Sequence, residues 1–246
     1  MTTFAVILPA AGKSARFADR NYKKPFAPLG GRAVWLHSAE RFMNRPDVKQ
    51  VIVAVATEDR EFFDLKFGAN VAILGVHVVE GGKERADSVQ RALERVTSEI
   101  DFVAIHDAAR PCLADSWVDA VFQAAARDGA AILAAPVNAT LKRVDQKKHI
   151  TATVDRELLW EAQTPQVFRR ELLLKAYAQR GKDALTDDSQ LVERLGQAVT
   201  VVPCSPLNLK ITTRDDLKLA EQVLKVLPKP KLEGFQHPFA DDNLWR

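Results

Sequence analysis

Phe4-Ala5-Val6-Ile7-Leu8-Pro9-Ala10-Ala11-Gly12 is the stretch of sequence that decides the fold. Its five successive apolar residues predict a strand buried in a parallel sheet. Pro9 ends that strand, because proline has no N–H to donate to a central ladder. The small residues that follow let the backbone approach a ligand closely. We therefore expect an α/β chain with a binding loop directly after its first strand.

A dense run of basic residues follows this loop. The run comprises Lys13, Arg16, Arg20, Lys23 and Lys24, with Asp19 as the acid among them. Exposed backbone N–H groups beside several cations form a site for phosphates. A solvated basic face on a strand-to-helix turn is the alternative for the cations alone. The unit as a whole, placed at the start of an α/β chain, favours the phosphate site.

Composition sets limits on the class of protein. A chain of 246 residues is long enough for one large α/β domain and short for two. A net charge of +3 is too small to indicate a nucleic-acid partner. Two cysteines, Cys112 and Cys204, cannot form a disulfide framework, which predicts a cytoplasmic location. We expect neither a membrane span nor a targeting peptide, since the first predicted strand begins at residue 4.

Short apolar strands alternate with helical patterns up to residue 135. We expect strands at 50–55, within 71–79, at 102–105 and at 130–135, and helices at 34–42, 59–67, 86–96 and 117–125. This alternation predicts right-handed βαβ units in a Rossmann-like, doubly wound, mostly parallel sheet. Ligands bind at the carboxyl ends of such strands. The polar loops at 9–12, 81–88 and 106–111 should therefore converge.

The pattern changes in the second half of the chain. Apolar segments at 141–144 and 150–154 flank a polar turn and predict a protruding β-hairpin arm. Because an isolated hairpin is marginally stable, we expect it to pack on a second subunit, and solution scattering from a monomer would count against this. Thr213 and Asp216 have capping-box spacing before a closing helix. We expect one domain over 1–227, with the arm at about 137–156 serving dimerisation, and a C-terminal tail at 228–246 that is disordered by default.

Several catalytic patterns are missing from the sequence. Dinucleotide-binding and P-loop glycine patterns are absent, as is zinc-ligand spacing, and Ser14 and Ser88 lack a His–acid pair. Phosphate chemistry supported by cations and a metal remains. Asp107, just after an apolar strand, is the best candidate ligand for Mg²⁺, although it could instead cap the next turn or pair with Arg110. We expect His106 to be structural.

A series of short motifs occurs in order along the chain. They are Pro9-Ala-Ala-Gly12 with Arg16 and Lys24, Glu84-Arg-Ala-Asp-Ser-Val89, His106-Asp-Ala-Ala-Arg-Pro111, Ala135-Pro-Val137 with Thr140, Thr153-Val-Asp-Arg156, Leu159-Trp160 with Thr164-Pro-Gln166, Thr186-Asp-Asp188 and Asn208-Leu-Lys-Ile-Thr212. Over about residues 4–225 the series resembles the 2-C-methyl-D-erythritol 4-phosphate cytidylyltransferase family of the non-mevalonate isoprenoid pathway. The first motif is shared by many nucleotidyltransferases, whereas the second and third together are specific.

The resemblance implies a reaction and a set of site residues. The reaction is transfer of CMP from CTP to 2-C-methyl-D-erythritol 4-phosphate, which releases pyrophosphate and uses Mg²⁺. The implied catalytic residues are Arg16, Lys24 and Lys210. The implied nucleotide-binding residues are Ala10, Ala11, Gly12, Gly82, Arg85, Ser88 and Asp107, with Asp107 also the metal ligand. The implied substrate-binding residues are Arg110, Thr140, Arg156 and Thr164, of which Thr140 and Arg156 would come from the hairpin of a partner in a homodimer.

The chain departs from the family pattern at several positions, and two other functions stay open. Lys23-Lys24-Pro25 leaves Lys23 as an alternative to Lys24, Lys83 replaces a common acidic residue, and Leu207 stands where an aspartate is common. Another polyol phosphate, such as ribitol 5-phosphate, is an alternative acceptor. A non-catalytic nucleotide-binding regulatory protein is an alternative of another class, but such a protein has no need of transition-state cations.

Overall fold

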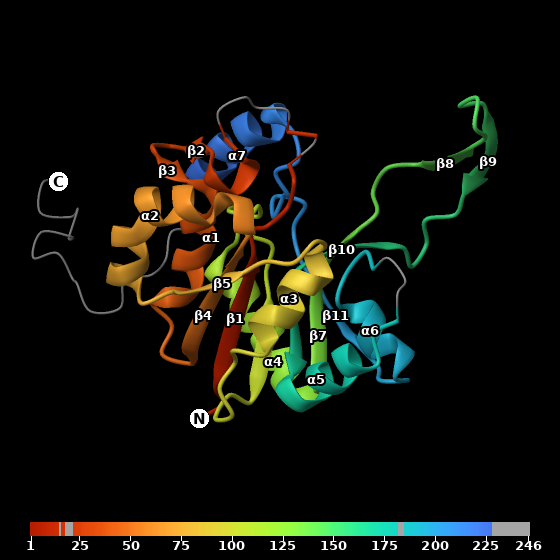
Figure 1. Ribbon diagram of the computed structural model, residues 1–246. Helices are drawn as coiled ribbons and strands as arrows, with labels where there is room; N and C mark the ends of the chain where they lie inside the picture. The colour runs from red at the N-terminus through yellow and green to blue at the C-terminus, as the bar shows by residue number, and fades with distance from the viewer. Residues whose placement is uncertain (15, 18–21, 182–184, 228–246) are drawn as a thin grey trace, which may run out of the picture.

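A seven-stranded sheet forms the centre of the molecule in the computed structural model, which describes residues 1–14, 16–17, 22–181 and 185–227 (Figure 1). The strands are β1 (Phe4–Pro9), β4 (Val48–Val55), β5 (His77–Glu80), β6 (Phe102–Ile105), β7 (Ala130–Pro136), β10 (Trp160–Arg169) and β11 (Thr200–Pro203). Their order is β11-β7-β10-β6-β1-β4-β5. Every neighbouring pair is parallel except those that involve β10. The predicted mostly parallel α/β sheet is confirmed, and Pro9 is the last residue of β1 as expected.

The sequence analysis did not anticipate strand β10, which runs antiparallel between β6 and β7. Its register shifts between Ala162 and Gln166, so Pro165 falls where the ladder with β7 is interrupted. Glutamines and a proline break the apolar run that marks the other central strands. The position of β10 matters for the site because Thr164 lies next to the loop that follows β6.

Helices cover both faces of the sheet. Helices α1 (Val34–Met43), α2 (Arg60–Leu74) and α4 (Asp115–Asp128) pack on one face, and α3 (Arg85–Leu93), α5 (Arg170–Ala178) and α6 (Ser189–Arg194) pack on the other. This is the predicted doubly wound arrangement, although α5 and α6 were not expected. Helix α2 continues to Leu74, where Gly75 at φ 64° ends it, so the strand expected within 71–79 begins at His77.

Helix α7 (Arg214–Val226) is the last element that the structure describes. Its predicted capping box is present, since Thr213 Oγ1 accepts from the Asp216 N–H and the Asp216 carboxylate accepts from the Thr213 N–H. Ala220 and Val223 are buried in a cluster that also contains Ile211. The Ile211 N–H donates to the Ala109 carbonyl at 2.8 Å, which places Lys210 beside the loop after β6.

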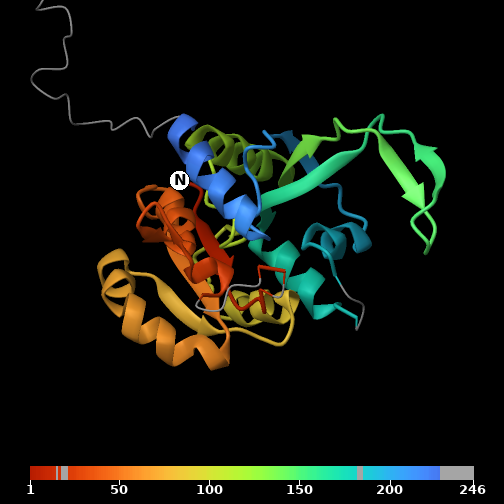
Figure 2. The same cartoon turned by 90° about the horizontal axis from the view of Figure 1, so that it is seen from above.

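The predicted hairpin is a two-stranded sheet of its own, formed by β8 (Leu141–Val144) and β9 (Ile150–Val154). It projects away from the central sheet, as both views show (Figures 1 and 2). Most of its side chains are exposed, Val144 and Ile150 among them. Short elements complete the described residues: η1 (Lys24–Phe26), β2 (Pro28–Leu29), β3 (Arg32–Ala33) and η2 (Thr57–Asp59).

Two expectations fall outside the described residues: the place of Arg20 in the basic run and the tail at 228–246. Within the described part of the chain, no helix has both the length and the apolar character that crossing a membrane requires.

Candidate active site

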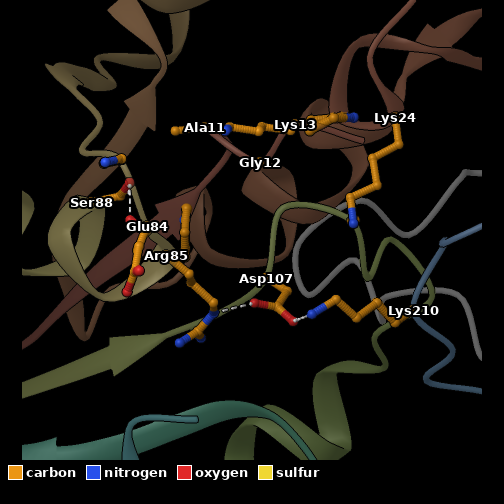
Figure 3. A pocket seen from close by; sticks show the side chains of 13 residues that line it. Ala11, Gly12, Lys13, Lys24, Glu84, Arg85, Ser88, Asp107 and Lys210 are labelled. Carbon is orange, nitrogen blue, oxygen red and sulfur yellow. Dashed lines mark hydrogen bonds and ion pairs between the residues drawn. The ribbon is translucent and has the colours of Figure 1, made fainter. Parts of the chain in front are cut away.

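The three polar loops converge as predicted around a pocket of about 200 Å³ (Figure 3). Lining residues of the pocket follow the carboxyl ends of β1, β5 and β6. In Figure 1 this is the end of the sheet nearest α7. Its lining residues are Pro9, Ala11, Gly12 and Lys13 of the first loop, Lys83, Glu84, Arg85 and Ser88 of the second, Asp107 and Ala109 of the third, and Lys24, Pro25 and Lys210 from two further segments. The pocket therefore combines five cationic side chains with two carboxylates.

Asp107 is the electrostatic centre of the pocket. Its Oδ1 accepts from Arg85 Nε at 3.0 Å, its Oδ2 lies 2.6 Å from Lys210 Nζ, and Arg110 Nε is 3.8 Å from Oδ2. The side chain is only 9% exposed. Burial alone would raise the pKa of Asp107, but the positive charges of these three neighbours hold it well below its usual range. Asp107 is thus a buried carboxylate that stays ionised.

Lys24, rather than Lys23, points into the pocket. Lys23 Nζ is bound to Glu58 Oε1 at 3.1 Å and to Asp59 Oδ2 at 2.7 Å, whereas Lys24 lines the pocket. Burial lowers the pKa of Lys24, and the charge of Lys210 lowers it further. The carboxylates of η2 pair with Lys23, so of the two lysines that the sequence left open, Lys24 is the one that lines the pocket.

Arg16 lies at the border of the pocket. Its side chain is exposed and does not belong to the pocket lining. Its positive charge nevertheless contributes to the lowered pKa of Lys24, so the two cations are within electrostatic reach of each other. Lys24, Asp107 and Lys210 therefore share one pocket, with Arg16 next to it.

The expected nucleotide-binding residues do not all face the pocket. The Ala10 N–H donates to the Ala54 carbonyl at 2.8 Å and its side chain is buried, so of the three nucleotide-binding residues expected from the first loop, Ala11 and Gly12 line the pocket and Ala10 does not. The Gly82 N–H donates to Ser88 Oγ at 3.0 Å. Gly82 lies instead in an adjoining pocket that shares Ala11, Lys13 and Lys83 with the first.

Two of the expected substrate-binding residues lie behind Asp107. Arg110 donates to the Asn208 carbonyl at 2.6 Å, and its side chain is 12% exposed. Thr164 is buried, and its hydroxyl accepts from the Asp107 N–H at 3.0 Å and pairs with His106 Nδ1 at 3.1 Å. Burial lowers the pKa of His106 to about 4, so its imidazole is neutral. That environment agrees with the structural role expected for His106.

The other two, Thr140 and Arg156, are exposed and belong to the arm. Arg156 donates to the Asn138 carbonyl at the base of the arm. The fold of a single chain does not bring either residue to the pocket lining.

Sequence reasoning placed Lys13 in the basic run beside the expected phosphate site, and Lys13 lines the pocket. It left Lys83 and Glu84 out of the expected site residues and assigned no role to Asp188. Arg85 Nη1 donates to Asp188 Oδ2 at 2.7 Å, which makes Asp188 the second carboxylate on that guanidinium. Asp188 stands in the Thr186-Asp-Asp188 motif, and that motif was the available signal. Spacing alone could not reveal its partner, because Arg85 and Asp188 are separated by 103 positions.

The chain is similar over most of its length to a known family and to known proteins. A model of the family described as IspD, 2-C-methyl-D-erythritol 4-phosphate cytidylyltransferase, matches residues 4–226. The 2-C-methyl-D-erythritol 4-phosphate cytidylyltransferase of Rhodopirellula baltica is 44% identical over 232 residues, which cover 89% of this chain and 94% of that protein. The protein of the same name from Endomicrobium trichonymphae is 41% identical over 221 residues, which cover 90% of this chain and 98% of that protein.

Solved structures show the same likeness. The crystal structure of 2-C-methyl-D-erythritol 4-phosphate cytidylyltransferase from Thermus thermophilus matches with a TM-score of 0.73 at 33% identity, covering 92% of this chain and 100% of that chain. A crystal structure of 4-diphosphocytidyl-2C-methyl-D-erythritol synthase matches with a TM-score of 0.77 at 30% identity, covering 91% and 99%. The matched portions extend over nearly the whole described fold.

Proposed function

The chain belongs to the 2-C-methyl-D-erythritol 4-phosphate cytidylyltransferase family, and from that premise we propose how its pocket transfers CMP from CTP to 2-C-methyl-D-erythritol 4-phosphate. One observation carries the assignment of residues. Lys24, Arg85 and Lys210 come from three separate segments, and their charged groups gather around the ionised carboxylate of Asp107 in one pocket (Figure 3).

The reaction joins two anions. An oxygen of the 4-phosphate attacks the α-phosphorus of CTP, the bond from that phosphorus to the bridging oxygen breaks, and pyrophosphate leaves with the bond's electrons. The attacking phosphate monoester is already an anion, so no general base is required. Cations fixed in place before the reaction stabilise the charge that collects on the α-phosphoryl oxygens. Lys24, Lys210 and Arg16 supply those cations in our proposal, and the backbone of Ala11 and Gly12 contacts the triphosphate.

Asp107 fits a divalent cation as a single protein ligand. Its carboxylate is ionised and lines the pocket, and among the described residues no three His, Cys, Asp or Glu side chains gather to form a complete metal site. Mg²⁺ is commonly held by one or two carboxylates together with substrate phosphates and water. Mg²⁺ held by Asp107 would neutralise charge on the triphosphate.

We assign the acceptor end of the site to two subunits. Residues 1–227 act as one catalytic domain in this proposal, and the arm at about 137–156 reaches a second copy to form a homodimer. The support is that β8 and β9 form a sheet separate from the central one and expose apolar side chains, which a partner would cover. Arg110 and Thr164 would then serve the acceptor from one chain, and Thr140 and Arg156 from the other.

A mixture of two inactive variants tests the shared site. Arg156→Ala and Lys210→Ala, each inactive alone, should regain about a quarter of wild-type activity when co-expressed, because random pairing gives half heterodimers with one intact site of two. Pyrophosphate release by the co-purified mixture is the measurement. A mixture no more active than its separate components would show that each chain builds its own complete site.

The reaction itself is tested by pyrophosphate release from CTP with Mg²⁺ and a panel of polyol phosphates. We expect 2-C-methyl-D-erythritol 4-phosphate to be used far better than ribitol 5-phosphate. Preference for ribitol 5-phosphate would overturn the acceptor assignment. Binding of CTP without turnover of any acceptor would favour the regulatory alternative.

The lowered pKa of Lys24 predicts a pH dependence. The transfer needs the ammonium form, so kcat/KM for CTP should fall as pH rises through a pKa below the ordinary 10.5 of lysine. Asp107 should contribute no acidic limb, because its pKa lies well below its usual range. Lys24→Arg should move the alkaline limb to higher pH, since a guanidinium stays protonated. An identical limb in Lys24→Arg and wild type would assign it to another group, and Lys23→Arg is the matched control.

Close contact between the first two loops predicts the effect of a single methyl group. A Cβ at Gly81 would lie 2.4 Å from Ala11 Cβ and 3.3 Å from the Val55 carbonyl oxygen. Gly81→Ala should push the loops apart and lower kcat/KM by about 10²-fold, the cost of misplacement by roughly 1 Å. Gly68→Ala is the control, because nothing lies within 4 Å of its added Cβ and alanine favours the helix. Wild-type kinetics in Gly81→Ala would show that the two loops accommodate the added methyl group without displacing pocket residues, and would contradict this prediction.

A reducing cytoplasm is the proposed location. Its support is that Cys112 and Cys204 are both free, one buried and one partly buried.

A further inference from the structure

Asp188 is a buried carboxylate at the start of a helix, and its side chain does not cap that helix. It stands at the N-cap of α6, where an aspartate normally accepts from the backbone of the first helical turn, yet its side chain makes no capping hydrogen bond to that helix. Asp187 takes part of that role, since its Oδ1 accepts from the Gln190 N–H at 3.3 Å and from Ser189 Oγ at 3.2 Å. The Asp188 carboxylate is left for other partners, and its side chain is 1% exposed.

Those partners fix Asp188 from two sides. The Tyr177 hydroxyl, at the end of α5, donates to Asp188 Oδ1 at 2.6 Å, and burial raises the pKa of Tyr177, so it remains a donor. The Gln166 side-chain oxygen, on β10, accepts from the Asp188 N–H at 3.0 Å and from the Ser189 N–H at 3.1 Å. Backbone and carboxylate are therefore both held in place by residues outside the pocket.

The second oxygen of Asp188 binds the cation that reaches the pocket. Arg85 donates through Nη1 to Asp188 at 2.7 Å and through Nε to Asp107 at 3.0 Å, so one guanidinium bridges two carboxylates. Burial alone would lower the pKa of Arg85, and the charge of Asp188, followed by that of Asp107, raises it instead. The bridge is thus a largely buried network in which one guanidinium contacts two carboxylates.

A separate contact holds the same end of α3. Arg180 Nη1 lies 2.7 Å from Asp87, and its Nη2 lies 3.8 Å from Glu84, the two residues of the α3 capping box. Helix α3 begins at Arg85. Arg180, which follows α5, therefore holds the first turn of α3, and Asp188, which precedes α6, holds the Arg85 side chain.

We infer that Asp188, supported by Tyr177, is a positioning residue for nucleotide binding that holds the Arg85 guanidinium so that it offers Asp107 one donor instead of two. This inference rests on the proposed function. Without the Asp188 charge, the guanidinium is free to turn and pair through two N–H groups with Asp107, the geometry that arginine prefers with a carboxylate. Asp107 would then be less available to a divalent cation, and Arg85 would leave its place at the pocket wall.

A double-mutant cycle read by calorimetry tests the inference, with CTP and Mg²⁺ and no acceptor. Asp188→Asn should raise the dissociation constant of CTP by about tenfold and the half-saturating Mg²⁺ concentration similarly, within the range of coupling between residues in contact. In the Arg85→Gln background, Asp188→Asn should change either quantity by less than about twofold, because the residue acts through Arg85. Asp188→Glu should recover part of the binding, since it restores the carboxylate.

Two further variants separate positioning from folding. Asp187→Asn, the matched control, removes the neighbouring negative charge but keeps an acceptor oxygen for the Gln190 N–H and the Ser189 hydroxyl. Because Asp187 makes no contact with Arg85 among the described ion pairs, this variant should leave CTP binding unchanged. Tyr177→Phe keeps the Arg85 pair and should weaken binding in the same direction by a smaller factor. Circular dichroism and thermal melting establish that each variant is folded.

Equal effects of Asp188→Asn with and without Arg85, or wild-type binding by Asp188→Asn, would overturn the inference in an enzyme that is otherwise active. If the wild-type chain binds CTP but consumes no polyol phosphate, the proposed function is wrong. The double-mutant cycle on CTP binding would still test the inference about Asp188.

Discussion

Replacement of Lys24 by alanine is expected to lower kcat for CMP transfer by about 10²–10³-fold, the usual cost of removing one fixed group that stabilises transition-state charge. The effect should fall mainly on kcat, because negative charge on the α-phosphoryl oxygens rises as the reaction proceeds. Steady-state pyrophosphate release at saturating CTP is the measurement.

The same substitution should leave stability unchanged or improve it. Lys24 is half-buried beside the cations Lys210 and Arg16, and burial and these charges lower its pKa. Its ammonium therefore costs free energy in the folded state, a cost that functional sites commonly carry. Lys23→Ala is the matched control: it breaks the pairs with Glu58 and Asp59 but should retain most activity. A lower melting temperature in Lys24→Ala, or near wild-type turnover, would contradict the assignment.

Lys210→Ala should show a loss of similar size, about 10²–10³-fold in kcat/KM. Lys210 Nζ lies 2.6 Å from Asp107, so the lysine orders the carboxylate in the free protein. In the proposed function it faces the triphosphate once CTP is bound. Its removal takes away a cation and leaves Asp107 with Arg85 and Arg110 as neighbours. We expect Lys210→Ala to raise KM for CTP and to lower kcat, whereas Lys24→Ala should lower mainly kcat.

Lys218→Ala is the control for Lys210. Lys218 lies on α7 and its ammonium pairs with Asp215 at the exposed surface, 3.2 Å away. Exposed pairs of this kind contribute little, so activity and melting temperature should both match wild type. If Lys210→Ala retained more than about a tenth of wild-type kcat/KM, the pocket would not depend on preorganised cations in the way proposed.

Much of the fold could be predicted because its strands carry a local signal. Strands β1, β4, β6 and β7 are continuous apolar runs over most of their length. Such a run indicates a strand that is buried on both faces. Strand β10 lacks that signal: its first residues are exposed, its middle is polar, and burial comes only from its place between β6 and β7. Its assignment required partners that are distant in the sequence.

The same distinction separates the parts of the site. Convergence of the loops at 9–12, 81–88 and 106–111 follows from parallel strands, because their carboxyl ends must lie on one edge. The selection of Lys24 over Lys23 does not follow from pattern, since adjacent lysines are equivalent until Glu58 and Asp59 come close to one of them.

The sequence by itself determined the α/β class, the position of the binding edge and the family of this protein, because apolar periodicity and short motifs are properties of neighbouring residues. Only the tertiary structure decided which cation faces which carboxylate: that Lys210 and Arg85 share Asp107, and that Asp188 holds Arg85 from behind. The two carboxylates on Arg85 are 22 and 103 positions away from it, and the energy of such pairs depends on distance and burial, which no local pattern records.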